Sequence, residues 1–485
     1  MYGDKYTGPD YTYPSGKKQE SNIFQCFLDA FPNEAGKGDE GANWFIHGIA
    51  PSYPHNKPLN PAGYFKDVFP EGVRLGTNVG GLSKERFNEV IKDALSTKKA
   101  IGLSVGPNAA LANLIGQKNR GKINSMVHTI LTFGAVLGIA LLVIGMMVAR
   151  RILVASGTPE TVLDQALLYI RIYFVGIPFM VAYNFGAAIV RSYGDTRRPM
   201  CYLIVSGVLN VILNLLLVIG FHLGVAGVAI ATVISNAVSS VILYRRLRKS
   251  TQEIHLEPRM LRIDMHSLGQ ILRIGLPAGV QSALFAVSNI VIQSAINSLG
   301  TVVMAASSAA FNIEVITYDI LNSFSQACTT FVGQNYGAGD IRRCRRTLLL
   351  CLIEGAIALA AAISVILCFG KSLLAIFNND PEVVATGFIR LMMVMLSHSL
   401  SLMYEVMSGY LRGFGISLPP ALLTMLGVCG VRIAWIQWVF PQSRTFKTIM
   451  TVYPVSLSAT ALLIFIALLY YRPSRRHAAA QAVSI

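Results

Sequence analysis

Ten long apolar segments constrain the fold of this chain more than any other feature of its sequence. They lie near residues 124–148, 165–190, 199–221, 224–244, 270–298, 302–332, 347–369, 384–411, 417–440 and 449–471. About twenty apolar residues in a helix cross the hydrocarbon core of a bilayer, and a helix satisfies its own backbone amides there. The sequence therefore predicts an all-α polytopic membrane protein. Its expected surroundings are the lipid bilayer.

The first hundred residues have a different composition. Residues 1–100 contain 12 Lys and Arg and 12 Asp and Glu, and no apolar run among them is long enough to cross a bilayer. The formal charge of +16 therefore belongs to the rest of the chain. We interpret 1–100 as a small soluble segment of unknown origin without a secretory signal. The excess positive charge is expected to set the membrane topology, and no nucleic-acid partner is expected.

The Lys and Arg residues are divided unequally between alternate loops. Together with the carboxyl end, one set of loops contains 21 of them, and the opposite set contains five. Loops rich in Lys and Arg stay in the cytoplasm. We therefore expect the first set of loops and the carboxyl end to be cytoplasmic, and we place the segment 1–100 on the same side.

An internal repeat divides the membrane part in two. The segment YNFGAAIVRSYGDTRRP from Tyr183 matches YEVMSGYLRGFGISLPP from Tyr404 at a constant offset of 221 residues. Both copies run the same way through the membrane, which predicts two pseudo-repeated helix bundles. The partners of the first two helices of the second bundle would fall within 49–111, and most of that region is too polar to cross. The first bundle is therefore expected to lack helix 1 and most of helix 2, with 101–117 re-entrant or at the membrane surface.

These patterns predict five regions along the chain. They are a soluble segment at 1–100, an incomplete first helix bundle at 101–248, a basic cytoplasmic linker at 249–269, a second six-helix bundle at 270–475 and a cytoplasmic tail at 476–485.

Several segments of the membrane part carry a resemblance to a known family. They are GLSVGPNAALANLIGQKN from Gly102, LYIRIYFVGIPFMVAYN from Leu168, RSYGDTRRP from Arg191, SGVLNVILNLLLV from Ser206, LGVAGVAIATVISNAVS from Leu223, GLPAGVQS from Gly275 and TTFVGQNYGAGD from Thr329. On these segments, residues 101–475 resemble the bacterial members of the multidrug and toxic compound extrusion (MATE) family. The resemblance implies twelve helices in two bundles, a V-shaped central cavity, and export of organic cations driven by Na⁺ or H⁺. Many members keep a coupling aspartate in an apolar-Asp-Thr pattern in helix 1, and the membrane part of this sequence has no such pattern.

Carboxylates inside the predicted spans are the candidates for transport and ion coupling. An ionisable group in a membrane helix costs free energy and usually faces a wet cavity. Four occur here, namely Glu314, Asp319, Glu354 and Glu405. Glu314 and Glu405 form the preferred pair, while Asp319, only five residues from Glu314, is expected to point elsewhere. A structural ion pair of Glu405 with Arg412 or Arg390 is an alternative that the sequence leaves open.

Four other polar residues in the spans are candidates for lining a cavity. Asn184, Asn210 and Asn214 would offer hydrogen bonds to a substrate or cation, although asparagines in bilayers also tie helices together. Arg432 stands alone in its span. It is either an internal counter-ion or a side chain that snorkels towards the surface.

No enzyme motif is present, because the sequence has no Walker A loop, no nucleophile elbow and no H-E-x-x-H pair. The histidines and cysteines show no metal-ligand spacing, so no metal and no cofactor are expected. We therefore predict an efflux antiporter for amphipathic organic cations in the bacterial inner membrane, coupled to H⁺ or Na⁺, with no oligomer implied. Because of the missing helices, this chain is expected to transport poorly. The alternatives are a non-transporting fusion product and a lipid-linked sugar flippase of the same superfamily.

Overall fold

The computed structural model describes residues 103–155, 160–250 and 254–473, and these residues form helices and connecting turns without a β-strand. The predicted segments 1–100 and 476–485 lie outside the described residues. Ten helices in the described part are long and apolar enough to cross a membrane. The predicted all-α polytopic membrane fold is confirmed.

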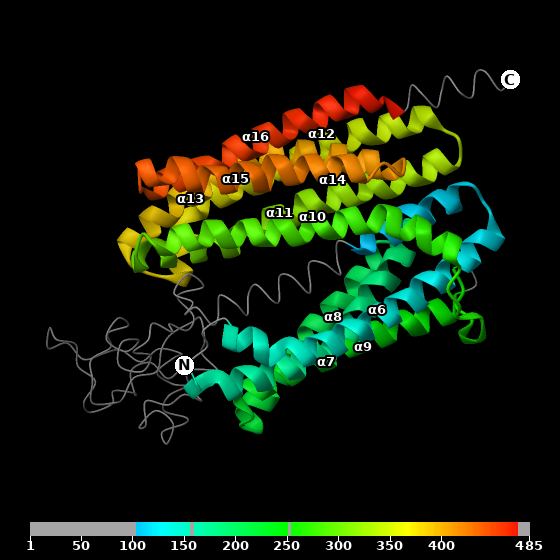
Figure 1. The fold of residues 1–485 in the computed structure, drawn as a ribbon, viewed down its shortest axis with the longest axis horizontal. Coiled ribbons are helices and arrows are strands. Elements are labelled where there is room, and N and C mark those ends of the chain that lie inside the picture. Colours follow the sequence, from blue (N-terminus) through cyan, green and yellow to red (C-terminus); the bar gives the residue numbers. More distant parts are fainter. Residues whose placement is uncertain (1–102, 156–159, 251–253, 474–485) are drawn as a thin grey trace, which may run out of the picture.

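The helices gather into two bundles (Figure 1). The first contains α6 (Arg120–Ala155), α7 (Glu160–Ser192), α8 (Arg197–Asn214) with its π-helical continuation η2 (Leu215–Gly220), and α9 (Gly224–Arg248). The second contains α10 (Met265–Asn297), α11 (Thr301–Gly337), α12 (Ile341–Phe377), α13 (Pro381–Gly413), α14 (Leu418–Thr424), η4 (Met425–Gly430), α15 (Val431–Ala434), η5 (Trp435–Val439), η6 (Phe440–Gln442) and α16 (Phe446–Tyr471). The elements from α14 to η6 together make one span, Leu418–Gln442.

The helices extend beyond the apolar runs that predicted them. The clearest case is α10, which begins at Met265 and so occupies the last residues of the predicted linker 249–269. Asp264 caps this helix, because its carboxylate accepts a hydrogen bond of 2.9 Å from the backbone N–H of Ser267. An N-terminal cap of this kind marks where a helix begins, and hydropathy alone does not mark that position.

Large apolar side chains cover the outer surface of both bundles. Met147 is 73% exposed, Ile357 66% and Leu426 66%. Exposed apolar area on this scale is characteristic of a surface that lipid covers, because water would disfavour it.

Equivalent turns support the internal repeat. After α7, the N–H of Gly194 donates to the carbonyl of Arg191 at 2.8 Å, and after α13 the N–H of Gly415 donates to the carbonyl of Arg412 at 2.9 Å. Both glycines have positive φ, +88° and +79°, which is the region that favours glycine. The two halves therefore end corresponding helices with the same local geometry.

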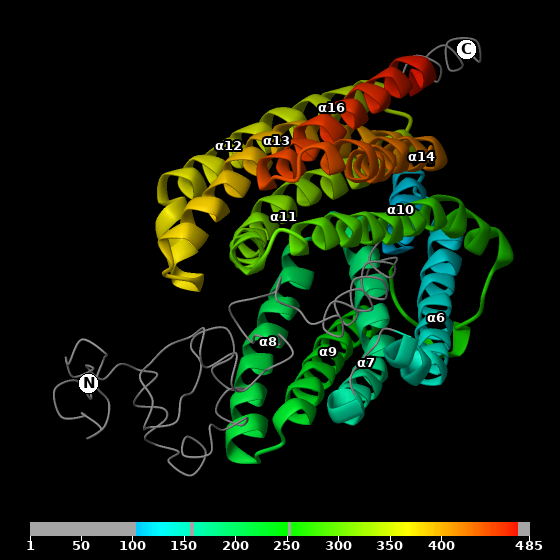
Figure 2. The same cartoon turned by 60° about the vertical axis from the view of Figure 1, so that its left-hand side comes forward.

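A short helix over residues 103–116 joins the two bundles (Figure 2). Most of its side chains are buried within the protein. The amide of Asn108 donates to the hydroxyl of Thr330 in α11 at 2.9 Å. Gly275 of α10 allows close approach, because a Cβ there would stand 2.7 Å from the carbonyl oxygen of Leu103. The helix is buried because the second bundle offers it a surface of small residues.

Candidate functional site

The interior of the second bundle contains a buried ion pair between α11 and α13, which lie side by side. Glu314 Oε2 accepts hydrogen bonds from Arg390 Nη2 at 2.8 Å and from Arg390 Nε at 3.1 Å. Arg390 Nη1 donates to Ser307 Oγ at 2.6 Å. Both charged side chains are buried. The first candidate carboxylate is therefore held tightly by a guanidinium.

A histidine lies close to this pair. His398 is buried in α13, and its Nδ1 is 2.9 Å from the hydroxyl of Thr317, one turn of α11 beyond Glu314. His398 is not among the site residues predicted from the sequence. The same criterion that selected the carboxylates, an ionisable group within an apolar span, would have selected it.

Glu405 is held more loosely than Glu314. Its Oε2 lies 4.0 Å from Nη1 of Arg412, two turns later in the same helix. The guanidinium of Arg412 is anchored on the other side, where Nη2 donates to Gln281 Oε1 of α10 at 2.9 Å. Both Glu405 and Arg412 are buried. Of the two partners that the sequence left open for Glu405, the structure places Arg412 beside it and gives Arg390 to Glu314.

Arg432 is an internal group and does not snorkel to the surface. It is 5% exposed, and its Nη1 donates to Asn289 Oδ1 at 3.1 Å. Its Cζ stands over the ring of Tyr453, 4.6 Å from the ring centroid. The same ring lies 5.7 Å from Cζ of Arg390. Tyr453 therefore stands between two guanidinium groups, where the negative face of its ring is attractive to cations.

The remaining carboxylates are placed elsewhere. Asp319 lies on an exposed face of α11, whereas Glu314 is buried on another face, as their spacing suggested. Glu354 is exposed on α12. The structure brings Glu314 and Glu405 into the second bundle and leaves Asp319 and Glu354 outside its buried interior.

The three asparagines form contacts within the first bundle. The amide of Asn184 donates to the carbonyl of Met180 in its own helix at 2.9 Å. Asn210 of α8 lies 3.3 Å from Ser235 Oγ of α9, and the amide of Asn214 donates to Asn210 Oδ1 at 3.0 Å. Of the three, only Asn210 contacts a neighbouring helix, whereas the contacts of Asn184 and Asn214 lie within their own helices.

The second bundle thus contains two buried carboxylates that differ in their distance from the nearest guanidinium group. One is engaged in short hydrogen bonds with an arginine, and the other lies beyond hydrogen-bond length from its nearest guanidinium. No group of three or more His, Cys, Asp or Glu residues that would hold a metal ion occurs in the described ranges. The interior of the second bundle therefore contains two buried carboxylates that differ in how closely a guanidinium approaches them.

Comparison with known proteins agrees with this architecture. The MatE family model matches residues 95–216 and 277–436. The probable multidrug resistance protein YoeA of Bacillus subtilis is 28% identical over 374 residues, which cover 75% of this chain and 81% of that protein. The FAD transporter of Shewanella oneidensis is 27% identical over 295 residues, with coverages of 59% and 64%. These relatives are transporters and not enzymes, and they do not favour a fusion product or a sugar flippase.

Solved structures show the same fold. An outward-facing multidrug resistance MATE family transporter of the MOP superfamily has a TM-score of 0.75 at 20% identity, covering 83% of this chain and 90% of that one. A MOP superfamily transporter from Pyrococcus furiosus, whose binding pocket is described as having reverse polarity, also has a TM-score of 0.75, at 19% identity and with coverages of 84% and 90%. Because the family model matches more than half of the chain and the two-bundle fold agrees, this protein belongs to the MATE family of multidrug efflux transporters.

Proposed function

We propose that this protein is an ion-coupled antiporter that exports amphipathic organic cations in exchange for H⁺ or Na⁺. It acts as a multi-pass protein of a bacterial cytoplasmic membrane, since the relatives described above include bacterial multidrug resistance proteins. One observation carries the coupling proposal. Glu405 is a buried carboxylate whose nearest guanidinium, that of Arg412, lies 4.0 Å away.

The distance matters because a carboxylate in short hydrogen bonds has little capacity left for a coupling ion. Glu314 is in that state, with two contacts from Arg390. Glu405 can accept a proton or bind a cation without first breaking a short ion pair. Occupation of Glu405 weakens its attraction to Arg412, which stays bonded to Gln281 of α10. The contact between α13 and α10, which lies within the second bundle, then depends on the coupling ion.

Gradient-driven export in proteoliposomes tests the proposal. The test uses a restored protein, in which family-like first and second helices replace residues 1–100, because the chain itself is expected to export poorly. The purified restored protein is given an imposed H⁺ or Na⁺ gradient, and ethidium movement is followed by fluorescence. Glu405→Gln is expected to reduce gradient-driven export to the passive leak. The matched control is Glu354→Gln, because Glu354 is a membrane-helix glutamate on the exposed face of α12. Full export by Glu405→Gln would refute the assignment.

A further inference from the structure

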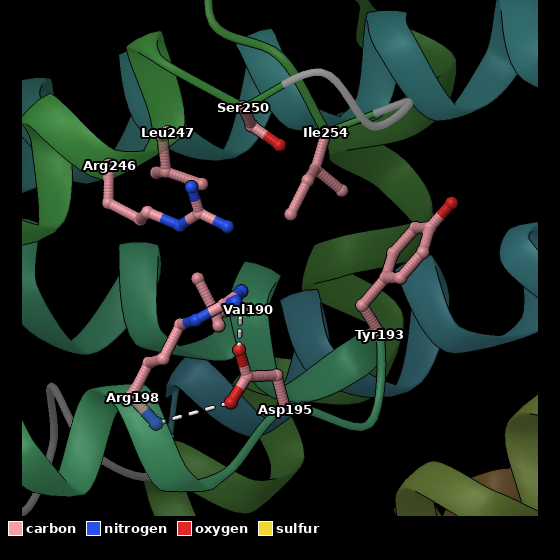
Figure 3. Close-up of a pocket in the computed structure, with 8 residues that line it drawn as sticks. All are labelled: Val190, Tyr193, Asp195, Arg198, Arg246, Leu247, Ser250 and Ile254. Atoms are coloured by element: carbon pink, nitrogen blue, oxygen red, sulfur yellow. Dashed lines mark hydrogen bonds and ion pairs between the residues drawn. The ribbon is translucent and has the colours of Figure 1, made fainter.

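A small cavity opens at one end of the first bundle, where α7, α8 and α9 meet (Figure 3). Its volume is about 90 Å³. Ligand pockets for drug-sized molecules hold roughly 300 to 1,000 Å³. The cavity therefore fits a single small group, such as a phosphate, and is too small for an exported drug.

Two arginines from different helices point into this cavity. Arg198 comes from the first turn of α8 and Arg246 from the last turn of α9, and Figure 3 shows both side chains directed towards the same space. Arg198 Nη1 lies 3.0 Å from the carboxylate of Asp195. Among the described residues, Arg246 has no hydrogen-bond or ion-pair partner. Two guanidinium groups thus face one carboxylate, which leaves a positive charge for an anion to balance.

The start of α8 adds to this positive field. Its N-cap residue, Thr196, makes no side-chain hydrogen bond to the helix. Asp195 accepts one N–H of the first turn, that of Arg198, at 3.1 Å. The 18-residue helix therefore presents a positive end next to the cavity.

Apolar side chains also line the cavity. Val190, Leu247 and Ile254 are among its lining residues, and each is less than 5% exposed. Three membrane spans, Leu163–Ser192, Arg197–Gly220 and Gly224–Arg248, begin or end at this level. The cavity therefore lies at the depth of lipid headgroups, with both cationic and apolar side chains in its lining.

Topology alone does not account for the arrangement. Basic residues in the last turn of a helix complement its dipole, and basic loops keep a segment in the cytoplasm. Arg245 and Arg248 fit that explanation, because both are exposed at the end of α9. Arg246 is half-buried and turns towards the cavity and Arg198. A topology anchor would place it in water with its neighbours.

We propose that this cavity is a binding site for the phosphate group of a phosphate ester, with Arg246 and Arg198 as its ligands. Guanidinium groups bind phosphate oxygens through paired, charge-assisted hydrogen bonds. The ester is either the headgroup of an anionic phospholipid or a soluble phosphate ester from the cytoplasm. The site lies in the first bundle and is separate from the carboxylates of the second.

The experiment uses the full chain in detergent and two probes. Phosphatidylglycerol is titrated and bound lipid is counted by native mass spectrometry, and glycerol 3-phosphate is titrated with thermal unfolding as the readout. Arg246→Gln is expected to weaken binding about tenfold, which corresponds to the loss of one charge-assisted contact. Arg248→Gln, which removes the same charge from the same helix end, is expected to bind within twofold of the unaltered protein.

A second pair of variants repeats the comparison on α8. Arg198→Gln removes a ligand, and Arg197→Gln removes an exposed neighbour of equal charge. If Arg246→Gln does not fold, the comparison of Arg198→Gln with Arg197→Gln still tests whether the cavity binds a phosphate group. If Arg246→Gln and Arg198→Gln bind phosphatidylglycerol more weakly than their controls, the ligand is a lipid headgroup. If they bind only glycerol 3-phosphate more weakly than their controls, the ligand is a soluble ester. Equal affinity of each variant and its control for both probes would overturn the proposal.

Discussion

Gly337 of α11 packs against the backbone carbonyl of Asn113 so closely that a methyl group at Gly337 would overlap with the carbonyl oxygen. Gly116 meets the carbonyl of Gln334 in the same way. These contacts fix helix 103–116 on α11 and so join the two bundles. Membrane helices approach this closely only where small residues meet.

Gly337→Ala is therefore expected to force helix 103–116 away from α11, at a cost of about 1–3 kcal/mol of stability. The readout is disulfide formation between cysteines placed at Asn108 and Thr330, whose side chains are hydrogen-bonded at 2.9 Å. Cross-linking should slow in the alanine variant. Gly207→Ala serves as the control, because no heavy atom lies within 4 Å of a Cβ there. Unchanged cross-linking in Gly337→Ala would contradict the assigned contact.

Removing one partner of the Glu314–Arg390 pair leaves the other charge buried and unpaired. Glu314→Gln or Arg390→Gln alone should lower the free energy of unfolding by about 3–5 kcal/mol. The double variant should recover part of that loss, which denaturation of the purified proteins would measure. Arg343→Gln is the comparison, because the Arg343–Asp340 pair is exposed and such pairs contribute about 0–1 kcal/mol. Additive losses in the double variant would show that the two side chains do not stabilise one another.

The double variant also separates the two roles of Glu314. If Glu314 only balances Arg390, the stable double variant, made in the restored protein with family-like first and second helices, should export ethidium in proteoliposomes. If Glu314 couples transport as the sequence suggested, the double variant should fold without exporting. Retained export would remove Glu314 from the coupling residues.

Labelling of single cysteines tests the predicted topology. Lys249→Cys, at the exposed end of α9, should react with an impermeant thiol reagent only after the membrane is opened. Asn379→Cys lies in the exposed connection between α12 and α13, and it should react in intact cells. Labelling of Lys249→Cys in intact cells would show that the orientation in the membrane is opposite to the predicted one.

The cap of α10 predicts a dependence of stability on pH. The Ser267 hydroxyl donates to Asp264 Oδ2 at 2.6 Å and its backbone N–H donates at 2.9 Å, and these bonds lower the pKa of Asp264 below its ordinary value of 3.8. A lowered folded-state pKa contributes stability above the unfolded value, and that contribution is lost as the pH falls through the folded value. Melting temperatures at pH 3 and pH 7 should therefore differ less in Asp264→Asn than in the unaltered protein. An equal difference in both would exclude this contribution.

We expect the chain as its sequence stands to export drugs poorly. The described part of the first bundle supplies four spanning helices, whereas the second supplies six. Residues 1–100 are too polar to complete the first bundle. Ethidium accumulation in a pump-deficient bacterium should fall when 1–100 are replaced by family-like first and second helices. Equal, robust export by both versions would contradict this expectation.

The ten spans, the two bundles and the family follow from the amino-acid sequence alone. Each span depends on its own composition, because a membrane helix makes its backbone hydrogen bonds within one segment. The repeat at Tyr183 and Tyr404 was also readable, because equivalent turns need the same glycines, Gly194 and Gly415. These properties are local, so they can be read without knowing which helices are neighbours.

Which charged groups meet, in contrast, depends on how the helices pack in three dimensions. Glu314 and Arg390 are 76 residues apart, and Arg412 and Gln281 are 131 apart. Neither spacing carries information about contact, because neighbouring helices are selected by the fit of small residues along their whole length. The burial of helix 103–116 is a tertiary property for the same reason. Its amino-acid composition is marginal for a membrane span, and its stability comes from the surface of α10 and α11 that receives it.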